Sequence, residues 1–110
     1  MTLLTRSEEF VLLAVWRLQG DAYSLALMKQ LSKSTGESWS LGSIFTPLER
    51  LTKRGLVTSF RTKPTAERGG RPKRIYQLTP LGKRELLHTR EVENTMWSGI
   101  TNLALAGVRT

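Results

Sequence analysis

The sequence predicts one mainly α-helical domain that carries a small two-stranded antiparallel β-ribbon and ends in a long helix. Three observations lead to this fold class. Apolar residues recur at helical spacing in three short segments of the first half of the chain. A turn-rich stretch with two prolines and two glycines then separates two mixed apolar and polar runs, which is typical of paired strands joined by a loop. A further helical pattern starts at Thr79 and continues to about residue 106.

Length and composition limit the function. A chain of 110 residues with 39% hydrophobic content is suited to a single core. It has no cysteine, one histidine and one aspartate, so a nucleophilic triad or a transition-metal cluster can hardly be assembled within one protomer. We therefore expect no enzyme, no metal and no cofactor. The lack of cysteine fits a reducing cytoplasm, and the longest apolar run, Phe10 to Trp16, is too short to predict a membrane partner.

A first helix is predicted over residues 7–19, with Thr5 or Ser7 as its N-cap and two glutamates at the positive end of its dipole. Its middle is apolar on nearly every side, which is typical of a helix that is buried all round. So short a chain has little material of its own to cover such a helix. We therefore expect a second copy of the chain to cover one face, and assign Val11 and Val15 to dimerisation.

A second helix is predicted from Ser24 to about Thr35, and a third from Leu41 or Ser43 to Arg54. The third helix carries two stripes. The apolar stripe is expected to face the core and consists of Leu41, Ile44, Leu48 and Leu51. The opposite face is polar and basic and consists of Ser43, Thr46, Pro47, Arg50, Lys53 and Arg54. Small hydroxyls followed by arginine can lie in a DNA major groove. We expect Ser43, Thr46 and Arg50 to supply base choice there, while a merely solvated face is the alternative.

Positive charge is concentrated in residues 53–76, which hold eight basic residues and one acid, a net +7 of the +8 on the whole chain. The predicted strands, residues 56–62 and 73–78, lie inside this segment. Such a projection is suited to a polyanion, although a solvated basic loop without a partner is the alternative. The candidate contacts to DNA are Arg61, Lys63, Arg68, Gly69, Gly70, Arg71, Lys73, Arg74 and Tyr76.

Three short helices followed by a basic ribbon is the order of a winged helix-turn-helix, which we assign to residues 1–78. In that fold the third helix enters the major groove and the ribbon, or wing, reaches along the backbone or into the minor groove. The predicted partner is double-stranded DNA. An RNA-binding winged helix is the alternative, although the usual exposed aromatic platform for stacking bases is not evident.

Residues 79–106 are predicted to form one continuous helix of about 40 Å, longer than so small a domain can cover. An exposed apolar stripe normally marks a partner surface. With the apolar first helix, it predicts a symmetric homodimer. An adaptor that docks a different protein through this helix is the alternative. The residues assigned to dimerisation here are Leu87, Met96, Trp97, Ile100 and Leu103.

The segments SWSLGSIFTPLERLTKRGLV and GGRPKRIYQLTPLG resemble the PadR family of bacterial transcriptional regulators, in its short form with a single C-terminal helix. The resemblance covers about residues 3–100. It implies a dimeric repressor on a pseudo-palindromic operator, relieved by a small hydrophobic or aromatic effector at the dimer interface, near Trp97. Two positions depart from the family pattern. Phe45 stands where tyrosine is usual, and Ile75 precedes Tyr76 where two aromatic residues are usual.

Overall fold

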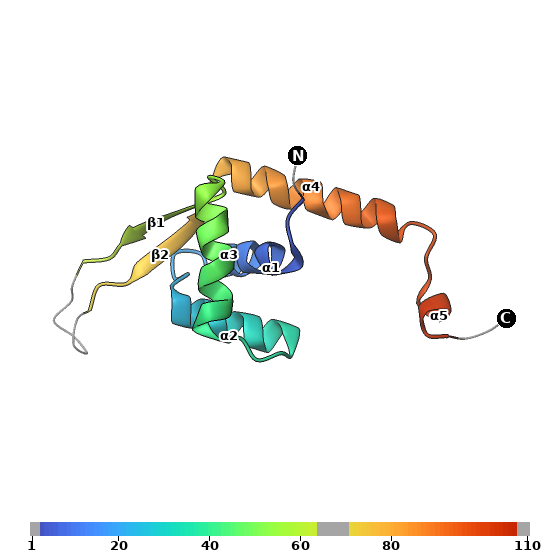
Figure 1. The fold of residues 1–110 in the computed structure, drawn as a ribbon, viewed down its shortest axis with the longest axis horizontal. Coiled ribbons are helices and arrows are strands. Elements are labelled where there is room, and N and C mark those ends of the chain that lie inside the picture. Colours follow the sequence, from blue (N-terminus) through green and yellow to red (C-terminus); the bar gives the residue numbers. More distant parts are fainter. Residues whose placement is uncertain (1–2, 64–70, 108–110) are drawn as a thin grey trace.

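The computed structural model describes residues 3–63 and 71–107 and confirms a mainly helical fold with a two-stranded antiparallel ribbon (Figure 1). The elements in chain order are α1 (Arg6–Arg17), α2 (Ser24–Thr35), α3 (Leu41–Lys53), β1 (Val57–Arg61), β2 (Arg74–Leu78), α4 (Pro80–Trp97) and α5 (Asn102–Leu105). The first three helices form a compact group, the ribbon projects from one side of it, and α4 crosses above and extends beyond it. None of the helices in the described part is long and apolar enough to cross a membrane.

The core lies where α1, α2 and α3 meet the base of the ribbon. Its largest fully buried side chains are Val11, Leu12, Leu27, Ile44, Leu48, Leu51 and Leu56. Val11 and Val15 are 0% and 3% exposed within the single chain, which corrects their assignment to a dimer surface. The apolar residues that α1 leaves exposed are Leu13 and Trp16, at 40% and 50%. One chain thus covers more of α1 than its composition predicts, and leaves a different face open.

The ribbon is anchored at its base and projects away from the core. Val57 pairs with Leu78 and Arg61 pairs with Arg74 at the two ends of the register. The Tyr76 backbone N–H donates to the Ala22 carbonyl at 2.9 Å, so the turn after α1 lies along the edge of β2. The ribbon is therefore held to the helical group by backbone hydrogen bonds as well as by side chains.

Helix α4 starts on the base of the ribbon. The Thr79 hydroxyl caps it by accepting from the Gly82 N–H at 3.0 Å and also donates to the Gly55 carbonyl at 2.7 Å. The Thr79 N–H donates to the Leu56 carbonyl at 3.1 Å. Gly82 is buried against the same Leu56 backbone, where a Cβ would overlap the carbonyl oxygen. The first turn of α4 and the start of β1 therefore form one tightly packed joint.

The last helix does not continue to residue 106, which corrects the sequence prediction. It ends at Trp97, because Ser98 is extended (ψ 127°) and Gly99 has φ +81°, a conformation that breaks helical hydrogen bonding. The Thr101 hydroxyl then caps the short helix α5 by accepting from the Ala104 N–H at 3.2 Å. Helix α5 stands apart from the body, next to the C-terminus (Figure 1).

Candidate nucleic-acid interface

Helix α3 buries a stripe formed by Ile44, Pro47, Leu48 and Leu51. Pro47 therefore faces the core, which corrects its placement on the polar face. It lies inside the helix rather than in the first turn, so the Ser43 carbonyl lacks its usual intrahelical donor. Leu41, expected in the core, is 43% exposed, and the first buried residue of α3 is Ile44. The exposed face of α3 is therefore rotated about the helix axis relative to the predicted polar face.

The residues opposite the buried stripe follow from the helical rotation of about 100° per residue. They are Gly42, Thr46, Glu49 and Lys53, all exposed. Thr46 donates from its hydroxyl to the Gly42 carbonyl at 3.2 Å, and Lys53 pairs with Glu49 at 3.2 Å. Sequence reasoning missed Glu49, whose carboxylate can accept a hydrogen bond from a cytosine amino group. Its spacing from Thr46 and Lys53 could have identified it.

Ser43 and Arg50 lie on one flank of α3. Ser40 and Ser43 form a reciprocal cap, in which the Ser43 hydroxyl oxygen accepts from the Ser40 N–H at 2.9 Å. The Arg50 Nε donates to the Glu8 Oε2 of α1 at 3.3 Å. Burial would raise the pKa of the Glu8 carboxyl, but hydrogen bonds from Thr5 and the Arg50 guanidinium outweigh it, so this pKa lies below its ordinary value. Both residues therefore make structural contacts on the face where base contacts were expected.

The described cations of the ribbon lie on its outer part. Arg61, Lys63 and Arg71 are exposed. Lys73 is also exposed, with its ammonium 4.0 Å from the centroid of the Tyr23 ring, and Arg74 donates to the Ser59 hydroxyl at 3.0 Å. Arg68, Gly69 and Gly70, expected at the tip, lie outside the described residues.

Tyr76, assigned to DNA binding, is partly buried against the core cluster, so only part of its side chain remains exposed. Its ring packs inward because the Ser59–Tyr76 pair lies two positions from the buried Val57, on the same face of the ribbon.

The pairing of Arg61 with Arg74 indicates what the ribbon can bind. These residues lie directly opposite each other at the outer end of the register. Like charges at such a position destabilise a two-stranded ribbon. An anion between or beside them would relieve this repulsion. The outer part of the ribbon therefore presents a cationic surface suited to a phosphate backbone.

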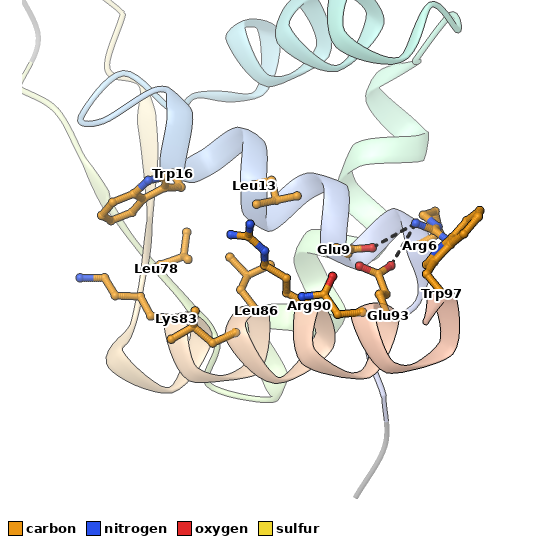
Figure 2. Close-up of a pocket in the computed structure, with 12 residues that line it drawn as sticks. Arg6, Glu9, Leu13, Trp16, Leu78, Lys83, Leu86, Arg90, Glu93 and Trp97 are labelled. Carbon is orange, nitrogen blue, oxygen red and sulfur yellow. Dashed lines mark hydrogen bonds and ion pairs between the residues drawn. The ribbon is translucent and has the colours of Figure 1, made fainter. Parts of the chain in front are cut away.

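A second feature is a cavity of about 730 Å³ between α1 and α4, with Trp16 near one end and Trp97 near the other (Figure 2). Trp97 is 54% exposed. Near it, Arg6 contacts the carboxylates of Glu93 at 3.1 Å and Glu9 at 3.6 Å. Burial raises the pKa of the Glu9 carboxyl, the neighbouring Glu93 raises it further, and Arg6 offsets only part of the shift.

The other residues assigned to dimerisation are exposed in the single chain. Met96, Leu103 and Leu87 are 71%, 64% and 62% exposed, and Ile100 is 49% exposed. Together with Leu13 and Trp16 of α1, they leave large apolar side chains exposed on α1, on α4 and in the segment that follows α4. Among the residues that the structure describes, no group of acidic or histidine side chains could hold a metal ion.

Similar chains of known structure share this architecture. A PadR-like transcriptional regulator from Bacillus cereus superposes with a TM-score of 0.71 at 23% identity, over 88% of this chain and 89% of that one. A PadR family transcription regulator from Clostridium difficile superposes with a TM-score of 0.65 at 19% identity, over 96% and 100%. The H. salinarum protein RosR gives 0.65 at 21% identity, over 94% and 86%.

Comparison of the sequence with known proteins and families identifies the family. No curated protein matches the chain. The model of the transcriptional regulator PadR-like family matches residues 12–88, from within α1 to within α4, and so includes the ribbon and the joint at Gly82. The chain therefore belongs to the PadR-like family of transcriptional regulators.

Proposed function

We propose that this protein is a sequence-specific DNA-binding repressor that acts as a homodimer on a pseudo-palindromic operator. The observation that carries the proposal is the position of the positive charge. The ribbon projects from the helical group beside α3 and carries exposed cations on its outer part, and among the described residues no acidic side chain pairs with Arg61 or Arg74, which lie opposite each other (Figure 1). A phosphate backbone supplies the missing negative charge.

The homodimer is supported by the large apolar side chains that α1 and α4 leave exposed. Leu13 and Trp16 of α1, and Leu87, Met96 and Trp97 of α4, are exposed although they are large and apolar. Several large apolar side chains exposed on two neighbouring helices are unusual on a monomer. A twofold dimer through these residues would leave both ribbons outward and place the two copies of α3 in successive major grooves, about one helical turn apart.

Selection of bound sequences from random duplexes tests the proposal directly. We expect an inverted repeat whose half-sites are about 10 base pairs apart, since each protomer contacts one half-site. A single half-site would contradict the dimer, and no enrichment at low ionic strength would contradict DNA binding itself. Fusing the selected operator to a reporter promoter then distinguishes repression from activation.

We also propose that a small, flat aromatic or hydrophobic effector binds at Trp97. The cavity between α1 and α4 supports this, because half of its lining residues are large apolar side chains and it carries an indole near each end (Figure 2). Occupancy there would change the angle between the two copies of α4 and so the spacing of the two wings.

Tryptophan fluorescence tests the effector site with a planar aromatic probe such as a bisbenzimide dye. Quenching is expected in the unsubstituted protein and in a Trp39→Phe control. The Trp39 indole lies outside the cavity, where it donates to the Thr35 hydroxyl at 3.0 Å. Quenching should be strongly reduced in Trp97→Phe. Equal quenching in both variants would exclude Trp97 from the site.

A further inference from the structure

The carboxylate of Glu8 makes two kinds of contact at once. It is the third residue of α1, and its side chain is 5% exposed. Oε1 accepts from the Thr5 N–H at 2.8 Å, which completes the cap of α1. Oε2 accepts from the Arg50 Nε at 3.3 Å, across 42 positions of sequence. The cap needs only the first oxygen, so the second is available to hold a residue of α3.

The contact engages only part of the guanidinium. Arginine has five N–H donors, and the hydrogen bond to Glu8 uses the one on Nε. The Arg50 side chain is 49% exposed, although its partner is almost completely buried. Arg50 is thus held at its inner end, while its outer end remains accessible to solvent.

The position of Arg50 on α3 decides which DNA group it can reach. Thr46, Glu49 and Lys53 lie opposite the buried stripe, on the line that penetrates deepest into a groove. Arg50 lies on the flank that faces α1. A flank residue meets the wall of the groove, which is lined by phosphates, rather than its floor, where the base edges are.

Resting on the proposed DNA binding, we infer that Glu8 is a positioning residue that holds the Arg50 guanidinium in the orientation needed to bind a backbone phosphate. A free arginine loses side-chain freedom when it binds, and a partner that fixes it beforehand reduces this loss. The buried carboxylate can do so without competing for the phosphate, because it contacts Nε alone. The ion pair also joins α3 to α1, beside their core packing.

The test is a double-mutant cycle on DNA affinity with Glu8→Gln and Arg50→Ala. Glutamine retains an acceptor for the Thr5 N–H but removes the charge that holds Arg50. We expect Glu8→Gln to weaken binding roughly three- to tenfold, on the selected operator and on mixed-sequence DNA alike. Arg50→Ala should weaken it more and lower the salt slope by about 1. In the Arg50→Ala background, Glu8→Gln should have no further effect.

Thr5→Ala is the matched control, because it removes a capping hydroxyl of α1 without touching Arg50. It should lower thermal stability and leave DNA affinity unchanged below the melting temperature. Additive losses from Glu8→Gln and Arg50→Ala would reduce Glu8 to a structural residue. Tighter binding by Glu8→Gln would show that Glu8 competes with DNA, and loss of discrimination at one base pair in Arg50→Ala would place Arg50 on a base. Absence of DNA binding by the unsubstituted protein would instead contradict the proposed function.

Discussion

Replacing Gly82 by alanine tests the joint between α4 and the ribbon. In an exposed helix this change stabilises by up to about 1 kcal/mol, because alanine has the higher helix propensity. At Gly82 the new Cβ would overlap the Leu56 carbonyl oxygen and lie 3.1 Å from the carbonyl carbon. Backbone cannot rotate away as a side chain can, so α4 must retreat. Forced overpacking costs about 1 to 3 kcal/mol.

Retreat of α4 also strains the hydrogen bonds that Thr79 makes to Leu56 and Gly55, each contributing about 1 kcal/mol. The net expectation is a loss of about 2 to 3 kcal/mol in the free energy of unfolding. In a domain of this size that lowers the melting temperature by roughly 10 °C or more. Circular dichroism melts at equal protein concentration measure it, which holds any contribution of dimerisation constant.

Gly42 provides the matched control within the same chain. A Cβ there would meet only the Ser40 hydroxyl oxygen, at 3.8 Å, so Gly42→Ala is expected to be neutral or stabilising by up to about 1 kcal/mol. If Gly82→Ala melts at or above the temperature of the unsubstituted protein while Gly42→Ala behaves as expected, the close packing of α4 on Leu56 cannot be what holds this joint together.

Three further predictions concern the two surfaces and the buried carboxyl pair. Replacing Arg71 and Arg74 by alanine should weaken binding to all duplexes and lower the salt slope by about 2, since each neutralises one phosphate; an unchanged slope in filter binding would exclude these contacts. Leu87→Glu should give a monomer in sedimentation, because it introduces a charge at an apolar side chain that is 62% exposed; a persistent dimer would place the interface elsewhere. Glu9→Gln should stabilise the protein more at neutral pH than at about pH 4, because a carboxyl whose pKa is raised beside Glu93 destabilises the fold as it ionises; urea titrations showing a larger gain in acid would have the wrong sign.

Local signals in the sequence were sufficient to locate most elements. Gly36 ends α2 with φ +73° as predicted, whereas Ser24, expected as its N-cap, is its first residue and Tyr23 precedes it without a side-chain cap. Thr79 caps α4, and Pro80 is its first residue. The ends of both observed strands lie within one residue of the predicted ends. These signals succeed because caps and left-handed glycines act through hydrogen bonds within a few residues.

Orientation was harder to predict where a helix is apolar on more than one side. In α1, composition could not distinguish Val11 and Val15, which the chain buries, from Leu13 and Trp16, which it leaves exposed. In α3, the apolar spacing allowed Leu41 in the core and Pro47 outside. The reverse is observed because the tertiary contacts begin only one turn into the helix. The ion pair between α1 and α3 had no local signal at all, since its partners are 42 residues apart.

The extent of the last helix was decided by one dipeptide. Ser98-Gly99 lies inside an apolar pattern that otherwise continues to Leu105, and a glycine alone costs a helix only about 1 kcal/mol. The left-handed Gly99 and the Thr101 cap together favour a break followed by a new turn. Hydrophobic periodicity does not report such a break, because it records where side chains point and not which backbone groups are bonded.

Two contacts described above connect α3 and the ribbon to the rest of the fold. Glu8 of α1 accepts a hydrogen bond from Arg50 of α3. The Leu56 carbonyl accepts from the Thr79 N–H and packs against Gly82 at the start of α4. Leu56 immediately precedes β1, so a rotation of α4 must carry the base of the ribbon with it. Helix α3 is held to α1 by the contact between Arg50 and Glu8, and α1 leaves Leu13 and Trp16 exposed. Leu56 is also held to α3, because its N–H donates to the Leu51 carbonyl at 2.9 Å. A change in the angle between α1 and α4, which line the cavity with the two tryptophans, would therefore act on the end of α3 as well as on the base of the ribbon.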